Sequence, residues 1–207
     1  DCREPIKTNP MPRLFTYTLT GMLSALLLTP TTLQADLVVL QYHHVDDDTP
    51  RATSTSPELF EQQLDYIDKL DLTVAPLLPA TRDALANRGA EGNQVAITFD
   101  DAYGSVYYTA APLLAARDMA YTVFVNTNAV GSRGYMTWQQ LESLAENPQV
   151  TIANHSADHG HLARKPGEKK AAWRERVAAS LDQAQAKLKD ELGQEIPMFA
   201  YPYGEFD

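Results

Sequence analysis

The stretch Val95-Ala96-Ile97-Thr98-Phe99-Asp100-Asp101 constrains the fold more than any other, because an apolar run leads directly into two adjacent carboxylates. A continuous run of this kind is typical of a strand that is buried on both faces. Two carboxylates buried there without partners would cost several kcal/mol each, so they need water or binding partners. A solvated turn after the strand would also place aspartates here. A functional role is favoured because the same arrangement recurs along the chain.

Similar apolar runs alternate with segments whose apolar residues recur at helical spacing. Strands are predicted over residues 37–42, 72–75, 95–99, 121–125, 150–153 and 196–200. Helices are predicted over residues 57–70, 80–88, 105–117, 138–146 and 169–192, with a loop at 89–93. The last helix should bury one face, formed by Trp173, Val177, Leu181, Ala184 and Leu188. Strands that alternate with helices through short loops predict a parallel sheet in an α/β architecture.

Polar side chains follow several predicted strands at the point where each strand ends. They are His43 and His44, Asp100 and Asp101, Asn126, His155, and Tyr203. Functional groups in α/β barrels and open parallel sheets gather at the carboxyl ends of the strands. The sequence therefore predicts that these side chains converge on one face of the domain.

Composition excludes some classes of partner. The formal net charge is −10 and the sequence pI is about 4.9, which argues against nucleic acid or an anionic membrane surface as the main partner. The single cysteine, Cys2, permits neither an internal disulfide nor a cysteine metal cluster. The five histidines fall into two groups, at 43–44 and 155–161, which scattered core histidines would not do.

Residues 11–35 have the features of a secretory signal. Met11 is followed by Arg13 and an apolar stretch, and Ala35 offers a small residue at the cleavage position. The apolar stretch is short for a transmembrane span, although an uncleaved anchor is the alternative. We expect residues 1–35 to be an N-terminal extension and signal peptide, with cleavage after Ala35 and export to the periplasm or the outside. The folded domain then covers residues 36–207, without a stable membrane span.

The segment His155-Ser156-Ala157-Asp158-His159 places two imidazoles four residues apart, so both can reach one metal ion. An exposed polar loop is the alternative, but the strand end and the acidic pair favour a metal. Two histidines and one carboxylate leave an open position, as a catalytic zinc site requires. Of the adjacent aspartates, one can ligate the ion while the other acts as base toward water. We expect Asp158 and His161 to be loop residues, and His43 and His44 to line the site or to be structural.

With these residues the sequence resembles the NodB-homology polysaccharide deacetylases, which are metal-dependent hydrolases that remove N-acetyl groups from glycans. The motifs are Thr98-Phe99-Asp100-Asp101, then His155 to His159 with Leu162 three residues later, and Ala200-Tyr201-Pro202-Tyr203-Gly204. The segment Tyr42–Val45 and Trp138 also resemble the subgroup of exported deacetylases that act on poly-N-acetylglucosamine. The likeness begins near residue 37, with the core motifs from about 93 onward.

This resemblance implies a distorted (β/α) barrel and a role for each motif. Asp100 would be the catalytic base, and Asp101, His155 and His159 would ligate one divalent ion. Zinc is the first choice, although this donor set also suits cobalt, nickel or iron. The backbone N–H of Tyr203 would help to form the oxyanion hole. We also expect His43, His44, Asn126 and Tyr201 to be substrate-binding residues.

Three departures from the family pattern matter. Ala200 stands where many members have an arginine that pairs with the catalytic aspartate, and His43 or His44 is a candidate substitute. Ala102 replaces a common glycine after the acidic pair. The sequence ends at Asp207, so the resemblance implies that the general-acid histidine and the closing strands of the barrel lie beyond it. The parent protein is expected to be a deacetylase, whereas these 207 residues alone need not be active or stable.

The sequence therefore predicts an exported hydrolase that acts on the carbon–nitrogen bond of an N-acetylhexosamine-containing polysaccharide. Two alternatives on the same fold are a metal-independent amidase and a carbohydrate-binding or scaffold protein with a degraded site. The intact set of Asp101, His155 and His159 argues against the amidase. A glycosidase would use two separated carboxylates rather than an adjacent pair.

Overall fold

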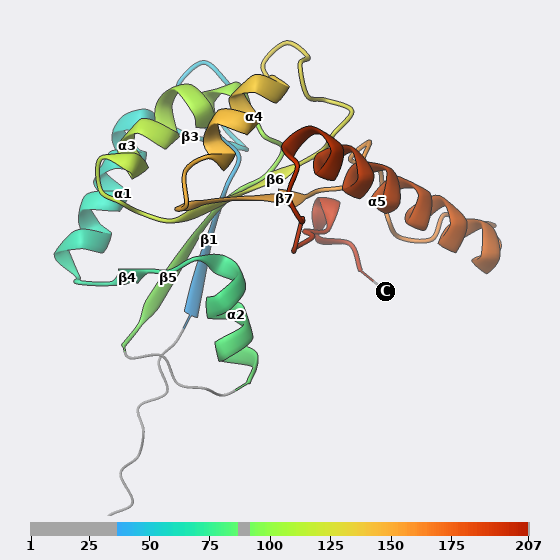
Figure 1. Cartoon of the computed structure of the whole chain (residues 1–207), viewed down its shortest axis with the longest axis horizontal. Helices are drawn as coiled ribbons and strands as arrows, with labels where there is room; N and C mark the ends of the chain where they lie inside the picture. Colours follow the sequence, from blue (N-terminus) through green and yellow to red (C-terminus); the bar gives the residue numbers. More distant parts are fainter. Residues whose placement is uncertain (1–36, 87–91, 207) are drawn as a thin grey trace, which may run out of the picture. The chain divides into compact units, whose positions relative to one another are not determined.

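The computed structural model describes residues 37–86 and 92–206, and its main sheet is parallel throughout (Figure 1). Its strands are β1 (Leu37–Tyr42), β4 (Thr73–Val74), β5 (Gln94–Phe99), β6 (Tyr121–Val125) and β7 (Val150–Asn154). The strand order is β1-β5-β6-β7, with β4 also paired to β5. A separate parallel pair consists of β2 (His44–Val45) and β3 (Ser54–Thr55). The predicted parallel α/β architecture is confirmed, and the described strands do not close into a barrel.

The helices begin and end at residues suited to capping. They are α1 (Pro57–Lys69), α2 (Leu77–Leu85), α3 (Ala111–Ala115), α4 (Trp138–Ala145) and α5 (Lys170–Leu192). The Ser56 hydroxyl accepts from the N–H of Leu59 at 3.2 Å, and Thr137 forms a capping box with Gln140. Gly193 ends α5 in the left-handed conformation, at a φ of 64°. These residues define the starts of α1 and α4 and the end of α5.

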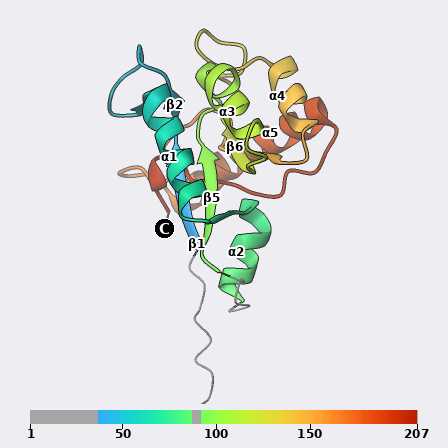
Figure 2. The ribbon, with the colours of Figure 1, turned by 90° about the vertical axis from the view of Figure 1, so that its left-hand side faces the viewer.

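Alternate residues of the strands face opposite sides of the sheet. One side packs against α1, where Phe60 makes edge-to-face contacts with Tyr42 of β1 and Phe99 of β5. Figure 2 shows α1 lying along β1 and β5, and α2 lies near the amino ends of the same strands (Figure 1). The other side presents Gln41, Thr98, Phe124 and, just past the strand ends, the candidate site residues. The alternation therefore separates a hydrophobic core from a polar face.

Two predicted elements differ in type from the structure. Residues 105–117 contain a π-helical turn, η1 (Val106–Ala110), before α3, and Pro112 lies in the first turn of α3, where its missing N–H is tolerated. The predicted strand at 196–200 is wrong as a full strand. Only one bridge joins Phe199 to Asn154, because Pro197 fixes its φ at about −65°, away from the values of a regular strand.

The buried face of α5 is shorter than predicted. Ala184 and Leu188 are buried, whereas Trp173, Val177 and Leu181 are half-buried. The second half of α5 packs on β7 and α4 (Figure 1), so only that half has a partner along its apolar stripe.

β1 is an edge strand with Val38 and Val39 exposed by 51% and 47%.

Some predictions lie outside the described residues. They are the signal peptide at 1–35 with cleavage after Ala35, the last two residues of the helix predicted over 80–88, and residues 89–91 of the predicted loop. Among residues 37–86 and 92–206, no helix combines the length and apolar character needed to cross a membrane.

Candidate active site

The side chains at the strand ends converge on one cavity of about 850 Å³. Asp100 and Asp101 follow β5, Asn126 follows β6, and His155 follows β7. All four are at least nine-tenths buried. The residues that face the hydrophobic core have odd numbers in β5 and β6 and even numbers in β7. Side chains alternate between the two faces of a strand, so Asp100, Asn126 and His155 all fall on the opposite, polar face. The predicted convergence is therefore confirmed for these strand ends.

His155 is held in the tautomer that suits a metal ligand. Its Nδ1 lies 2.9 Å from the carbonyl oxygen of Ala200, which can only accept, so Nδ1 bears the proton. The lone pair is then on Nε2, which points toward Asp100 and Asp101. Burial lowers the pKa of His155, the largest of several effects on this ring, and favours the neutral form that metals bind. A backbone carbonyl thus orients this imidazole.

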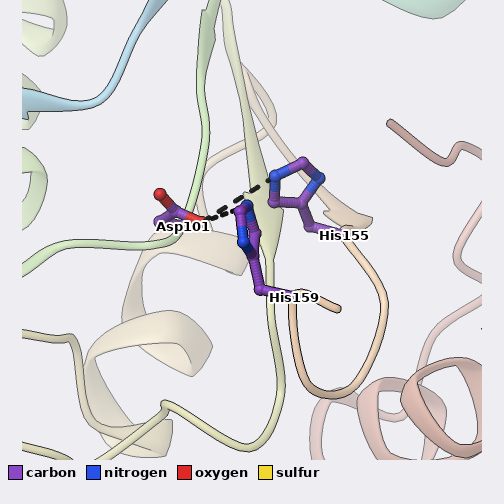
Figure 3. A group of neighbouring side chains, drawn as sticks. All are labelled: Asp101, His155 and His159. Atoms are coloured by element: carbon purple, nitrogen blue, oxygen red, sulfur yellow. Dashed lines mark ion pairs between the residues drawn. The ribbon is translucent and has the colours of Figure 1, made fainter. Parts of the chain in front are cut away.

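Asp101, His155 and His159 form a compact donor set (Figure 3). Oδ1 of Asp101 lies 3.8 Å from Nε2 of His155 and 3.3 Å from Nε2 of His159. All three ligand atoms lie within 4.8 Å of one another. Ligands about 2.0–2.1 Å from a tetrahedral zinc ion are themselves roughly 3.4 Å apart, so this spacing fits one ion. The three residues predicted as metal ligands therefore lie together, with donor atoms spaced as one ion would need.

Left-handed backbone conformations concentrate in the loops that bear these ligands. Asp101 (φ 72°), Ala102 (φ 56°), Ser156 (φ 68°), His159 (φ 52°) and Tyr203 (φ 58°) all adopt positive φ without being glycine. Such conformations cost on the order of 1 kcal/mol or more each and persist where the surroundings enforce them. Ala102 occupies the conformation that glycine would favour, and its carbonyl accepts from the N–H of Met136 at 2.9 Å.

Two asparagines hold the proposed ligands through hydrogen bonds, Asn126 to the side chain of Asp101 and Asn154 to the backbone just after His155. The Nδ2 of Asn126 donates to Oδ1 of Asp101 at 3.1 Å. Its own Oδ1 is buried and has no partner among the described residues. Asn154 accepts from the N–H of Ser156 at 2.8 Å and donates to Gln185 and to the carbonyl of Leu181, both at 3.1 Å. Outer-shell partners of this kind fix the direction of metal ligands.

The other predicted residues divide into those that line the cavity and those that do not. His43, Tyr201 and Tyr203 line it, and Tyr203 is 61% exposed. His44 does not line it, because its ring stacks on Tyr103 with centroids 3.6 Å apart. His161 is an exposed loop residue, as predicted, and its Nδ1 lies 2.9 Å from Glu205.

The sequence prediction missed several lining residues. Tyr103 and Tyr135 form an aromatic wall, with ring centroids 4.8 Å apart. Burial raises the pKa of Tyr103, and hydrogen bonds to Tyr135 and Asp101 add to this effect. Asp158 is an exposed loop residue, as predicted, and it also lines the cavity and accepts from the Ser180 hydroxyl at 2.7 Å. Gln41, the one polar residue in β1 before its final tyrosine, also lines the cavity.

Comparison with known proteins identifies the family. The sequence profile of the polysaccharide deacetylase family matches residues 87–207, more than half of the chain. The chain belongs to the polysaccharide deacetylase family. The chain places all three motifs of the NodB-homology domain around one cavity: the end of β5, the loop after β7, and the turn η2 (Pro202–Gly204).

Individual relatives agree with this assignment. The structure of IcaB from Ammonifex degensii has 32% sequence identity and a TM-score of 0.74, and the match covers 84% of this chain and 77% of IcaB. The Streptococcus pyogenes deacetylase PplD, solved in complex with acetate, shares the fold with a TM-score of 0.71 at 23% identity, over 83% of this chain and 75% of PplD. YxkH of Bacillus subtilis (strain 168) is 25% identical over 130 residues, which is 62% of this chain. The matched part of this chain spans 45% of the length of YxkH.

Proposed function

We propose that this protein is a metal-dependent deacetylase that removes N-acetyl groups from a polysaccharide containing N-acetylhexosamine units, and that it acts after export. The single observation that supports this best is the convergence of Asp101, His155 and His159 beside the buried carboxylate of Asp100. Three donors for one ion and an adjacent base are the groups that hydrolysis of an amide by activated water requires.

Asp101, His155 and His159 would hold the divalent ion, with zinc as the first choice because two imidazoles and one carboxylate suit it. When bound, the ion supplies Lewis acidity that polarises the acetamide carbonyl and makes water acidic enough to react near neutral pH. The protein supplies the orientation, through the Ala200 carbonyl on His155 and the Asn126 amide on Asp101.

Asp100 would take the proton from the attacking water as that water adds to the acetamide carbonyl. Its Oδ2 lies 3.9 Å from Nε2 of His155, so base and ligand face the same point. The N–H of Tyr203, in the turn η2 beside the cavity, would donate to the developing oxyanion. The carbon–nitrogen bond breaks, acetate leaves, and the freed amine takes up a proton.

The rim of the cavity supports a sugar substrate. Four tyrosines line it: Tyr103, Tyr135, Tyr201 and Tyr203. Aromatic side chains present large apolar faces with a polar tip, which suits the apolar face and the hydroxyls of a pyranose ring. We infer that a glycan strand lies against these tyrosines, with one acetamido group over the proposed metal ligands.

Metal content and acetate release test this proposal together. We expect about one zinc or similar ion per wild-type chain by elemental analysis, and acetate release from N-acetylglucosamine oligomers. His155→Ala should lose both. His161→Ala is the matched control, because this histidine belongs to the same loop but pairs with Glu205 outside the donor set, and it should keep the ion. A folded wild-type protein that binds no ion would contradict the proposal.

A further inference from the structure

We infer that Gln41 is the positioning residue for the Asp100 carboxylate, in a chain that lacks the arginine usual in this family at position 200. The inference rests on the proposed function, in which Asp100 is the base. The Nε2 of Gln41 donates to Oδ2 of Asp100 through a short hydrogen bond that joins residues 59 positions apart in the sequence.

The register of the sheet brings these two side chains together. Gln41 pairs with Thr98 in the parallel ladder between β1 and β5, and Asp100 lies two residues beyond Thr98. Paired residues in neighbouring strands point to the same face, as do residues two apart in one strand. Gln41 and Asp100 therefore share the polar face, whereas a shift of one residue would turn Gln41 toward α1.

The main chain of Asp100 is attached to the same part of β1. Its N–H donates to the carbonyl of Tyr42 at 2.9 Å, one residue after Gln41. The carboxylate of Asp100 is thus hydrogen-bonded to Gln41, and its backbone N–H is hydrogen-bonded to the next residue of β1, Tyr42. A carboxylate held at two points has fewer rotamers available, which is how an active site keeps a base within reach of its proton.

No charged side chain takes this role among the described residues. Within 37–86 and 92–206, neither a lysine nor an arginine forms an ion pair with Asp100. Ala200 lines the same cavity but offers only a methyl group. His44 stacks on Tyr103, and His43, although it lines the cavity, forms neither a hydrogen bond nor an ion pair with Asp100 in the part of the chain that the structure describes.

The bond also distinguishes the two oxygens of Asp100. Oδ2 accepts from Gln41 and is the oxygen 3.9 Å from His155. A carboxylate oxygen has two lone pairs, so Oδ2 can accept from Gln41 and still face the reacting water. Gln41 is exposed at the sheet edge and lines the cavity, and its side-chain hydrogen bond goes to Asp100, so we assign it to positioning the base.

Gln41→Leu tests the inference because leucine keeps similar bulk and removes the donor. We expect kcat to fall by about tenfold to a hundredfold, since a small misplacement of a catalytic group has effects of this size. KM and metal content should change by less than twofold, as roughly expected for a residue that touches neither substrate nor ion. Gln63→Leu is the matched control, because it removes a glutamine that bonds β1 from the other side. Gln63 belongs to α1 and accepts from the hydroxyl of Tyr42, which faces the core side of β1, at 2.8 Å.

Crystal structures of wild type and Gln41→Leu give a readout that does not depend on activity. The Asp100 carboxylate should be ordered in wild type and should rotate or become disordered in the variant. An unchanged Asp100 rotamer, or an unchanged kcat in an active wild-type background, would overturn the inference. If the metal-loaded wild type releases no acetate, the proposed function fails, and the crystal structures alone then decide whether Gln41 positions Asp100.

Discussion

The two sides of the cavity are built differently. The inner wall consists of the strand ends, Asp100, Asp101, Asn126 and His155, which are buried. The outer wall consists of the loop residues that line the cavity, and they are Tyr103, Tyr135, Asp158, His159, Tyr201 and Tyr203. Of these, Tyr201 and Tyr203 are 51% and 61% exposed. The difference shows that the proposed base and two of the three proposed metal ligands are fixed at strand ends, whereas His159 and the tyrosines proposed for the glycan are held by loops.

The two walls are also attached by different means. The inner wall follows from strand register and from buried amides such as those of Asn126 and Asn154. The outer wall depends on Arg176 of α5, which donates to the carbonyls of His161 and Ala163 and pairs with Glu168 at 2.8 Å. Changes to the inner wall should therefore affect stability and metal binding, and changes to the outer wall should depend on solution conditions.

The largest effect is expected for Asn154→Ala, which removes the buried amide behind His155. The N–H of Ser156 and the carbonyl of Leu181 would lose their partners in the interior. Each unsatisfied buried group costs about 1–3 kcal/mol, so the free energy of unfolding should fall by about 3 kcal/mol. Urea denaturation measures this.

Asn147→Ala is the control for Asn154→Ala. Asn147 lies just before the amino end of β7, and its side chain accepts one local hydrogen bond from the N–H of Gln149. Its replacement should cost less than about 1 kcal/mol. Equal losses for the two variants would contradict the view that the inner wall is the stable part of the site.

Asn126→Ala should weaken metal binding without unfolding the protein. Asp101 would lose the donor that directs its carboxylate, and loss of such an outer-shell partner lowers metal affinity by roughly 10–100-fold. A chelator competition measures the affinity. Asn128→Ala is the control, because Asn128 also lines the cavity but bonds Gln183 rather than a ligand. Matching affinities for the two variants would show that Asn126 has no directing role.

The outer wall should show a pH dependence that the inner amides do not. The hydrogen bond from Arg176 lowers the pKa of Glu168 to about 2, below its ordinary value. A lowered carboxyl pKa stabilises the fold above its unfolded-state value of about 4.3, and the stabilisation is lost as the pH falls toward 2. The difference in Tm between wild type and Glu168→Gln should be present at pH 6 and should shrink below about pH 4.3. A difference that stays constant over this range would sink the explanation.

The smallest effect is expected for Ala102→Gly. Glycine would relieve the left-handed backbone of Ala102, which costs roughly 1 kcal/mol. It would also remove a methyl group that is 1% exposed, and that loss costs about 0.8 kcal/mol. The two effects oppose each other, so urea denaturation should show a change below about 1 kcal/mol, with metal content unchanged. A larger change in either direction would mean that one of the two effects is absent.

The parts of the inner wall that sequence predicts are those that depend on local pattern. The apolar run before Asp100 predicts β5, and parallel strands bring their carboxyl ends together, so Asp101, His155 and His159 could be assigned to one site. Gln41 could not be assigned, because its role depends on the pairing of β1 with β5 in one register, which no local pattern specifies. Strand parity, applied to β1, is the signal that could have found it.

The outer wall was harder to predict for a related reason. The segment at 196–200 has the composition of a strand, but Pro197 and a single bridge to Asn154 limit it to a short contact. Tyr103 and Tyr135 meet through an antiparallel bridge between two loops, and the stack depends on positive φ values that sequence does not reveal. Surface loops are defined by tertiary contacts rather than by periodicity.

The bond between His155 and Ala200 has a consequence for how this site can vary. The acceptor is a main-chain oxygen, which every amino acid possesses, so position 200 can orient the imidazole whatever side chain it bears. Side chain and main chain at one position thereby serve separate tasks. Exchanging the residue at 200 leaves the tautomer of His155 intact, and the requirement to orient Asp100 can move to another strand.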